Sequence, residues 1–565
     1  MAGTAIAFDH LYTYDELTGA LRALADAHPT LMTLESVGTS YEGRDLWLAT
    51  ITNQATGPHH EKPAVWVDAN IHSVEHTGCV AALYLVHKLV TTHGADEQVT
   101  RAVDTRTFYV MPRVNPDGAE LALATPPTYL RSSVRTWPRV DEAPGLVGGD
   151  VDGDGRVLTM RVPDPNGAWK ISADDARLMV ARAPDEHGAG PYFRLLYEGT
   201  IRDYDGATIP IAPERRSLDL NRQFPAGWRV HGEQQGAGAF PLSEPETRAL
   251  ADALVARPNV CCYFAHHTFS AALLRPYDDR PDDEMPTADL RRYKQLGARG
   301  TELTGYRHVS VYHDFRYDPK DVITGGADTW AYDHLGAYGW TTEFWSPIPR
   351  AGITEYHLVE WFDAHPIADD IALLRYSDTE LGGRGFVDWY PFEHPQLGTI
   401  ELGGWDSFRF WENPPDELLE REVAPHADWE IFCALATPSL RTRDVLVESI
   451  GADVWRVRLV VENDGWMPTN VTQRAVERKI AQPVLATIEL PDDASLVRGA
   501  AVVELGQLEG RSFVTTMVGD FGSHSDTTPD RAVAEWLVTA QRGTTVTCVA
   551  AHARSGMVRE AVTLQ

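Results

Sequence analysis

The sequence contains little cysteine and far fewer basic than acidic residues, and both shortages exclude whole classes of protein. Five cysteines in 565 residues are too few, and too irregularly spaced, for a disulfide framework or for a zinc site made of thiolates. The 50 lysines and arginines stand against 81 aspartates and glutamates, which gives a formal net charge of −31. Because nucleic acids and anionic membranes bind basic surfaces, we expect neither as a partner.

Long apolar runs are absent as well. No window approaches the roughly 18 consecutive apolar residues that a membrane-spanning helix needs. The first residues, "MAGTAIAFDHLYTYDELTGAL", lack a basic stretch followed by an apolar core, so the sequence predicts no signal peptide. A cytoplasmic location is therefore the expectation.

The length of the chain and the pattern of its first half indicate the fold class. A chain of 565 residues exceeds the size of one hydrophobic core, so two or more domains are expected. In the first half, helical segments such as "YDELTGALRALADAHPTL" alternate with short, almost wholly apolar segments such as "KPAVWVDAN", "TFYVMPRV" and "VCCYFAHH". Such segments are typical of strands in a sheet that helices cover on both faces. The sequence thus predicts an α/β domain.

The rest of the chain departs from this pattern in two places. A polar insert over about 138–211, rich in Gly, Pro and Asp, shows no regular periodicity. In the last part of the chain, "VWRVRLVVENDGW" alternates apolar and charged residues before an Asn-Asp-Gly turn signal. We therefore predict a first domain over 1–434, with a packed extension over about 380–434, and an all-β sandwich domain over 435–565.

Polar residues accompany four of the predicted strands. His72 and Glu75 follow "AVWVDAN", "NPDG" follows "TFYVMP", the pair His266 and His267 ends "VCCYFAHH", and Glu343 lies in "GWTTEFW". Because sites assemble at the carboxyl ends of strands in open α/β sheets, we expect these residues to meet. Two imidazoles and one carboxylate form the ligand set of a catalytic zinc ion, which keeps a fourth position for water. The predicted zinc ligands are therefore His72, Glu75 and one of the two later histidines.

The adjacent histidines and Glu343 leave two questions open. In an extended chain His266 and His267 point to opposite faces, so only one of them can reach the metal. Zinc-assisted hydrolysis also needs a carboxylate that accepts the proton of the attacking water, and Glu343 is the candidate general base. The alternative for Glu343 is a salt bridge at a strand end, and the alternative for His72 and Glu75 is an ordinary polar turn.

Five blocks of the sequence occur in the order and approximate spacing of a known family. They are "HSVE", "NPDG", "DLNRQF", "HHTFSAALLRPY" and "GGADTWAYDHLGAYGWTTEF". Over roughly residues 8–360, apart from the insert, the sequence resembles the zinc metallocarboxypeptidases of the carboxypeptidase A/B type. The resemblance implies a mixed sheet sandwiched by helices, and it identifies His267 instead of His266 as the third zinc ligand.

The resemblance also implies roles for residues outside the metal site. In that family an Asn-Arg pair, which corresponds to Asn221 and Arg222 here, grips the free carboxylate of the last residue of the peptide. A second arginine stabilises the oxyanion of the tetrahedral intermediate. That arginine corresponds to Arg131, and Arg135 is a close alternative.

Two positions depart from the family pattern. Val74 stands where many members carry an arginine, so we expect an altered outer substrate subsite. The mobile tyrosine of the family has no clear equivalent, because Tyr312 and Tyr317 both lie in the inserted stretch "VYHDFRYDPKD" and the sequence does not decide between them.

We therefore expect a zinc-dependent metallocarboxypeptidase that hydrolyses the C-terminal bond of peptides with a free C-terminus. One alternative is a zinc-dependent amide deacylase of the same fold that acts on N-acyl amino acids, and another is a catalytically inactive binding protein. The intact "DLNR" block favours the peptidase over the deacylase. The presence of all three ligands and of Glu343 argues against the inactive protein.

The insert carries a second motif that is typical of metal sites. In "GDVDGDGRV", Asp150, Asp152 and Asp154 precede Gly155 with the spacing that opens an EF-hand calcium loop. The match is half complete, because Arg161 occupies the twelfth position, where that loop needs a bidentate glutamate. We predict that this loop binds a calcium ion that orders the insert, and a solvated acidic turn is the alternative.

Overall fold

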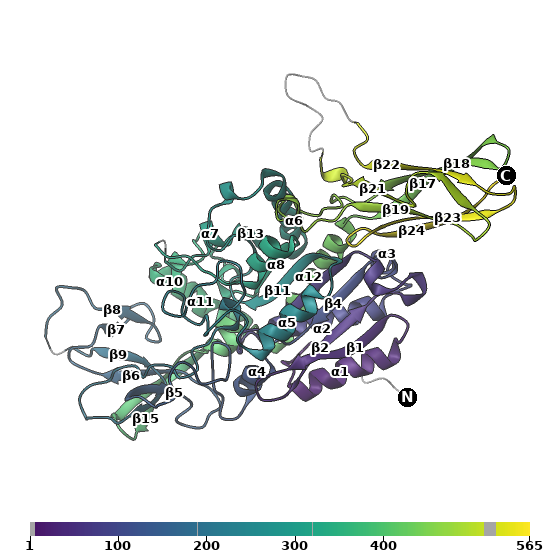
Figure 1. Cartoon of the computed structure of the whole chain (residues 1–565). Helices are drawn as coiled ribbons and strands as arrows, with labels where there is room; N and C mark the ends of the chain where they lie inside the picture. Colours follow the sequence, from purple (N-terminus) through teal and green to yellow (C-terminus); the bar gives the residue numbers. More distant parts are fainter. Residues whose placement is uncertain (1–5, 189, 319, 514–526) are drawn as a thin grey trace, which may run out of the picture.

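The protein consists of three parts arranged in a row (Figure 1). The computed structural model describes residues 6–188, 190–318, 320–513 and 527–565. Figure 1 shows the strands of the insert at one end, the α/β domain in the middle and the C-terminal strands at the other end. Within these residues, no helix has the length and the hydropathy needed to cross a membrane.

A mixed eight-stranded sheet forms the centre of the α/β domain. Its central strands β4, β3, β11 and β14 run parallel to one another, and antiparallel pairs join further strands at both sides. In spatial order the strands are β1 (Met32–Thr39), β2 (Asp45–Ile51), β4 (Thr107–Met111), β3 (Ala64–Ala69), β11 (Val260–Thr268), β14 (Tyr338–Phe344), β12 (Ala272–Arg275) and β13 (Arg307–Ser310).

Helices cover both faces of this sheet. One face packs against α1 (Tyr14–Ala27), α2 (His76–Thr91), α3 (Glu97–Thr105), α6 (Thr287–Thr304) and α12 (Leu419–Ala436). The opposite face packs against α5 (Pro245–Val255) and α8 (Ala327–Leu335). The remaining helices are α4 (Pro116–Leu123), α7 (Val311–Asp314), α9 (Pro347–Arg350), α10 (Glu360–Asp363), α11 (Ile367–Glu380) and α13 (Gln473–Glu477). The predicted fold class, a mixed sheet sandwiched by helices, is confirmed.

The two-sided burial explains why the strands are almost wholly apolar. On β3, Val65 and Val67 face the core beneath α2, whereas Trp66 belongs to the core beneath α5. On β11, Phe264 likewise belongs to the core beneath α2 and Tyr263 to the core beneath α5. Because successive side chains of a strand point to opposite faces, both sets must be apolar when helices cover both faces.

The insert forms short strands that the sequence pattern did not reveal. Four of them join two strands of the extension in one sheet, in the order β15 (Phe386–His394), β16 (Gly398–Trp405), β6 (Thr159–Pro163), β9 (Phe193–Tyr197), β7 (Trp169–Ile171) and β8 (Met179–Ala181). The other two, β5 (Gly145–Gly148) and β10 (Gly199–Arg202), pair with each other. Met160 from the insert and Leu402 from the extension lie in one small core, so the two segments form one lobe.

The C-terminal part is the predicted β sandwich. One sheet contains β17 (Leu440–Gly451), β18 (Val454–Asn463), β22 (Arg531–Thr539) and β20 (Ser495–Arg498). The other contains β21 (Val502–Gly506), β19 (Val484–Glu489), β23 (Thr545–His552) and β24 (Gly556–Thr563). Trp536 of the first sheet and Ala550 of the second share one core, as the apolar and polar alternation of "VWRVRLVV" predicts.

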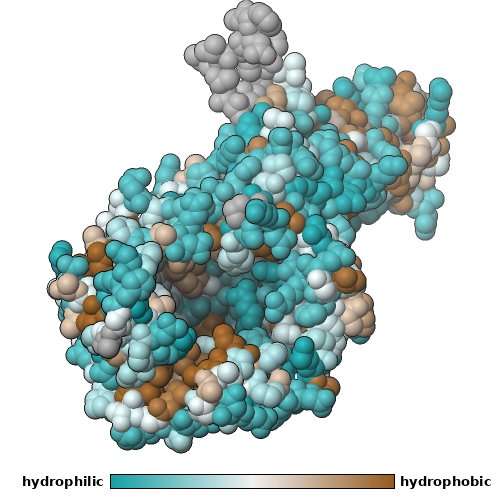
Figure 2. All heavy atoms as spheres, turned by 90° about the vertical axis from the view of Figure 1, so that its left-hand side faces the viewer, coloured by the Kyte–Doolittle hydropathy of each residue, from teal (hydrophilic) through white to brown (hydrophobic). Residues whose placement is uncertain are grey.

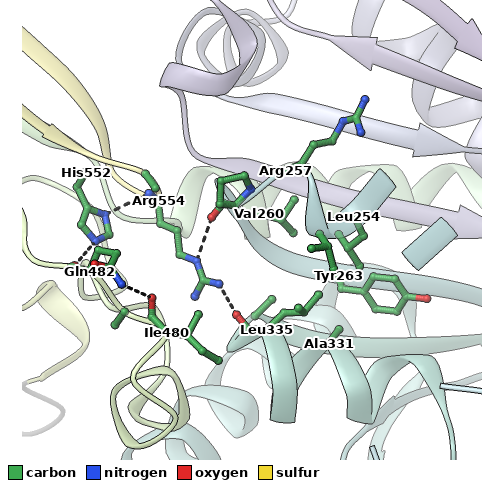
Figure 3. A pocket seen from close by; sticks show the side chains of 15 residues that line it. Leu254, Arg257, Val260, Tyr263, Ala331, Leu335, Ile480, Gln482, His552 and Arg554 are labelled. Carbon is green, nitrogen blue, oxygen red and sulfur yellow. Dashed lines mark hydrogen bonds between the residues drawn. The ribbon is translucent and has the colours of Figure 1, made fainter. Parts of the chain in front are cut away.

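An arginine fastens the sandwich to the α/β domain (Figure 3). The buried guanidinium of Arg554 donates hydrogen bonds to the carbonyls of Pro258 (3.3 Å), Gly336 (2.9 Å) and Leu335. A cavity of about 170 Å³ remains beside it, with Leu254 among its mainly apolar lining. The carbonyls at the end of α8 thus accept hydrogen bonds from an arginine of the sandwich domain. Because these bonds need a defined geometry, they fix how the two domains pack.

Candidate active site

Four of the polar residues that were expected to meet lie together at the carboxyl ends of the central strands: His72, Glu75, His267 and Glu343. His72 and Glu75 lie in the turn between β3 and α2, and Glu75 directly precedes the first residue of that helix. His267 lies on β11 and Glu343 on β14, where the parallel register places them side by side. Paired residues of neighbouring strands have side chains on the same face of the sheet. The side chains of His267 and Glu343 therefore lie on one face, near the turn that carries His72 and Glu75.

His72, Glu75 and His267 form a compact group of possible metal ligands. The Nδ1 atom of His72 lies 2.8 Å from Oε1 of Glu75, and the Nδ1 atom of His267 lies 2.9 Å from Oε2. The two Nδ1 atoms are 3.0 Å apart. All three side chains are buried, with 2% or less of each residue exposed. Two nitrogens and one carboxylate that face a common point are the donor set that suits a catalytic zinc ion.

The electrostatics of Glu75 agree with such a role. Burial disfavours the charged carboxylate, but the neighbouring His72 and His267 outweigh it, and the pKa of Glu75 is held below its usual range. The carboxylate is therefore ionised at neutral pH, which is the form that binds a metal.

Asp219 fixes the orientation of His72. Its Oδ1 atom lies 3.1 Å from Nε2 of His72, on the side of the ring opposite Glu75. Burial raises the pKa of Asp219, yet the charges of Arg131, Arg222 and His72 hold it well below its usual range. An ionised Asp219 accepts a hydrogen bond from the Nε2–H group of His72. The proton then stays on Nε2, and the lone pair of Nδ1 is available to a metal ion. The sequence contained this aspartate in "DLNRQF" but gave it no role.

The neighbouring His266 lies on the opposite face of the sheet. Its Nε2 atom is 2.6 Å from Oε1 of Glu430, which α12 supplies. Alternation along β11 separates it from His267, so the structure groups only His267 with His72 and Glu75.

A cavity beside this group is lined by the other residues that the sequence predicted. Arg131, Asn221, Arg222 and Glu343 all contribute to its wall, together with His72. Arg222 donates to the carbonyl of Asn221 (2.8 Å), and the amide oxygen of Asn221 accepts from the backbone of α8. These contacts hold the predicted carboxylate-binding pair at the cavity.

Arg131 is the arginine that faces the metal-ligand group. Its Nε atom donates to Asp219 (3.1 Å), and Nη1 lies 3.4 Å from Oε1 of Glu75. The alternative, Arg135, binds both carboxylate oxygens of Glu244 and does not line the cavity. The geometry therefore favours Arg131 of the two.

Glu343 is a buried carboxylate that lacks a partner. Its Oε2 atom has no hydrogen-bond partner among the described residues. Burial, and next the negative charge of Glu75, raise the pKa of Glu343 well above its usual range. A carboxylate of raised proton affinity beside the metal-ligand group is suited to accept a proton and to release it again.

Two further aspartates line the cavity, and the sequence gave no role to either of them. A Cβ atom on Gly326 would lie 2.3 Å from Oδ2 of Asp278 and 3.2 Å from Oδ1 of Asp328, so both carboxylates converge at this glycine. The other oxygen of each, Oδ1 of Asp278 and Oδ2 of Asp328, is buried without a hydrogen-bond partner among the described residues. Burial raises the pKa of both, and the charge of Asp328 raises that of Asp278 further.

The two tyrosines that the sequence did not distinguish differ in position. Tyr317 lines the cavity. Tyr312 does not line the cavity; instead its ring lies 4.0 Å from the guanidinium carbon of Arg316. Of the two, only Tyr317 can contact a molecule bound there.

The acidic motif of the insert forms a second group, with a different membership. Ligand oxygens of Asp150, Asp152 and Glu198 lie within 4.8 Å of one another. Asp154, the predicted third ligand, is paired instead with Arg156 at 2.6 Å. Every carboxylate oxygen of Asp150, Asp152 and Glu198 accepts a hydrogen bond from the protein. Calcium binding here stays a prediction from the sequence, and the hydrogen bonding favours the acidic turn.

Fold and site together define an α/β protein with a buried His-Glu-His group that could hold a metal ion at the carboxyl ends of its central strands. Residues 17–153 and 198–357, more than half of the chain, match the zinc carboxypeptidase family. The chain belongs to this family, and the resemblance seen in the sequence is confirmed. Residues 439–563 match a domain of unknown function (DUF8731). Neither match covers residues 358–438, which include the extension.

Individual relatives are distant. Carboxypeptidase B of Astacus astacus is 23% identical over 343 residues, which cover 59% of this chain and 85% of that protein. A zinc carboxypeptidase of Saccharothrix mutabilis subsp. capreolus is 31% identical over 126 residues, or 22% of this chain and 27% of that protein. The chain spans 60% to 64% of the length of the mammalian carboxypeptidases it matches. Among solved structures, carboxypeptidase A from Helicoverpa armigera has 16% identity and a TM-score of 0.42, with 76% and 73% of the two chains covered.

Proposed function

We propose that this protein is a zinc-dependent carboxypeptidase that hydrolyses the last bond of peptides with a free C-terminus. The observation that carries the proposal is the common cavity, where Glu343, Arg131 and the pair Asn221 and Arg222 lie beside the metal-ligand group. His72, Glu75 and His267 would hold the zinc ion. When bound, zinc would polarise the scissile carbonyl and lower the pKa of a water molecule.

The side chains around the cavity have different roles in the proposed reaction. Arg222, with Asn221, binds the terminal carboxylate, because a guanidinium offers a fork of donors that matches two carboxylate oxygens. Arg131 stabilises the negative charge that develops on the carbonyl oxygen. Glu343 accepts a proton from the attacking water and passes it to the leaving amine. Its Oε2 atom has no hydrogen-bond partner among the described residues. Tyr317 covers the bound terminal residue.

The two aspartates suggest which terminal residue is removed. Asp278 and Asp328 line the cavity that holds Arg222, and each has one buried oxygen without a hydrogen-bond partner among the described residues. Like charges close together in a buried site are unfavourable, and a cation between them removes the penalty. We therefore expect a preference for lysine or arginine as the C-terminal residue.

The test compares blocked dipeptides that end in a free acid with the same dipeptides as amides. Arg222→Ala should lower kcat/KM for the free acids by about 10-fold to 100-fold and change little for the amides, because only a carboxylate uses the guanidinium fork. The exposed Arg229→Ala is the matched control in the same segment. Equal losses on both substrates would favour an endopeptidase or the deacylase, and an N-acyl amino acid in the panel identifies the latter.

The same panel tests the terminal preference. Dipeptides ending in lysine should be cleaved faster than those ending in leucine, and Asp328→Asn should reduce that ratio by at least about tenfold. Asp283→Asn, which alters an exposed carboxylate nearby, should leave the ratio unchanged. A ratio near one in the unaltered protein would exclude the basic preference and leave the carboxypeptidase reaction in place.

A further inference from the structure

Glu412 brings a further carboxylate to the active site from a segment that the family match does not cover. It ends the helical turn Ser407–Glu412 of the extension, whereas the family match ends at residue 357. The next residue, Asn413, is buried and ties this turn to the zinc-ligand turn. Its side chain accepts from the backbone of Thr77 (3.0 Å) and donates to the carbonyl of Val74 (2.9 Å). Glu412 is therefore held in place by the same turn that carries His72 and Glu75.

The carboxylate of Glu412 lacks a cationic partner. Thr268, the residue after His267, donates a hydrogen bond to its Oε2 atom (3.2 Å). Among the described residues no other hydrogen bond and no salt bridge reaches it, because the nearby Arg131 is engaged by Asp219 and Glu75. Burial, and next the charge of Glu75, raise the pKa of Glu412 to about 7, while Arg131 opposes the shift. A cation that approaches this carboxylate would stabilise its ionised form.

Three aromatic side chains pack together, and two of them are chain neighbours of Thr268 and Glu412. Phe269 follows Thr268 in the chain, Trp411 precedes Glu412, and Phe362 completes the group. Their ring centroids lie 5.7 to 5.9 Å apart, and 46% of Phe362 is exposed. Aromatic faces attract cations as well as apolar side chains, so the wall suits an amine that is attached to an apolar stem.

These residues lie outside the cavity that receives the terminal residue. Glu412, Phe269, Trp411 and Phe362 are absent from its lining. If Arg222 binds the terminal carboxylate, the upstream part of the substrate lies outside this cavity. Glu412 is a carboxylate outside the cavity, and its partner Thr268 directly follows the proposed ligand His267. The end of the molecule that carries the insert is deeply hollowed, which leaves room for that part of the substrate (Figure 2).

We propose that Glu412 is a specificity-determining residue that binds an amino group of the substrate upstream of the scissile bond. The proposal rests on the proposed carboxypeptidase function. The amino group has two possible sources: the free α-amino group of a short peptide, or the side chain of a lysine in a longer one. Both present an ammonium ion, which forms charge-assisted hydrogen bonds with a carboxylate.

The experiment measures three substrates that share the same terminal lysine. One is an alanyl dipeptide with a free α-amino group, the second is its N-acetyl form, and the third is an N-acetyl tripeptide with lysine before the scissile bond. Glu412→Gln keeps the size of the side chain and removes its charge. Glu420→Gln alters an exposed carboxylate of the same extension and serves as the control.

In the unaltered protein, we expect the free dipeptide or the lysine tripeptide to have a kcat/KM at least about tenfold above that of the N-acetyl dipeptide. Glu412→Gln should abolish that advantage through KM and leave the N-acetyl dipeptide within about twofold. Which of the two substrates loses its advantage identifies the source of the amino group. Equal loss on all three substrates, or no loss on any, would overturn the proposal.

Calorimetry separates this proposal from the proposed function. In a Glu343→Gln background, the same three peptides are titrated into the zinc-loaded protein so that only binding is measured. Tighter binding of an amine-bearing peptide that Glu412→Gln removes supports the role of Glu412, even if the unaltered protein cleaves none of them. Equal affinities for all three peptides would overturn that role even if cleavage is rapid.

Discussion

Two groups of possible metal ligands occur in the described residues, and their ligand atoms have different surroundings. In the active-site group, the Nδ1 atoms of His72 and His267 and the carboxylate of Glu75 contact one another, and only Arg131 approaches from outside, at 3.4 Å. In the insert group, backbone amides and the hydroxyl of Tyr390 already occupy each carboxylate oxygen. Among the described residues, few donors from outside reach the first group, whereas each carboxylate oxygen of the second accepts one hydrogen bond.

The hydrogen-bond donors around the ligand atoms distinguish a buried metal site from an acidic turn. Two imidazole lone pairs and a carboxylate that face one another repel unless a proton or a cation lies between them. Carboxylates that accept amide hydrogen bonds are stabilised without an ion. Proximity of acidic and imidazole groups is therefore a weaker criterion for a metal site than the absence of other donors.

The largest expected effect concerns the ligands themselves. His267→Ala should reduce zinc from one ion per chain to near none after dialysis, because two remaining ligands hold zinc too weakly. The double variant Asp150→Asn and Asp152→Asn should keep its zinc. Metal content is measured by mass spectrometry on both proteins. A His267→Ala protein that retains a full zinc ion would contradict the assignment of the ligands.

A smaller effect is expected where a carboxylate supports a histidine. Asp219→Asn should weaken zinc binding by about 10-fold to 100-fold, because the supporting hydrogen bond orients His72 and sets its tautomer. Glu430→Gln, which alters the equivalent partner of His266, should leave zinc affinity unchanged. Competition with a chelating dye measures both affinities. Similar losses in the two variants would mean that Asp219 acts only through stability.

The smallest effect is expected at the insert. Adding calcium to chelated, zinc-reloaded protein should shift the melting temperature by less than about 1 °C, because no carboxylate oxygen requires an ion. The EF-hand spacing in the sequence predicts the opposite, a rise in melting temperature. A calcium-dependent rise that disappears in the Asp150→Asn and Asp152→Asn double variant would show that the loop binds calcium after all.

Much of the fold could be predicted from the sequence because it rests on local patterns. The apolar strands require cover on both faces, and the alternation in "VWRVRLVV" requires a sheet with one buried face. His72 and Glu75 lie three residues apart in one turn, so short-range spacing was enough to find them. The strands of the insert escaped prediction because they are short, and because β6, which joins them to the extension, pairs with β16 far away in the chain.

The residues that the sequence missed act through contacts between distant segments. Asp328 lies within a quoted block and Asp278 directly follows another, but only the fold brings their carboxylates together at Gly326. Glu412 lies near the site because Asn413 donates a hydrogen bond to Val74 in the turn of the proposed ligands. No motif in the sequence around Glu412 predicts that contact. Tertiary contacts of this kind carry no periodicity, so a single sequence does not reveal them.

Turnover of a blocked, lysine-terminated dipeptide by zinc-loaded Glu343→Gln protein tests the proposed reaction most directly. We expect one zinc ion per chain, as in the unaltered protein, and a fall in kcat of at least about 10², because the glutamine amide cannot accept the proton of the attacking water. Turnover near that of the unaltered protein, with zinc in place, would rule out Glu343 as the general base.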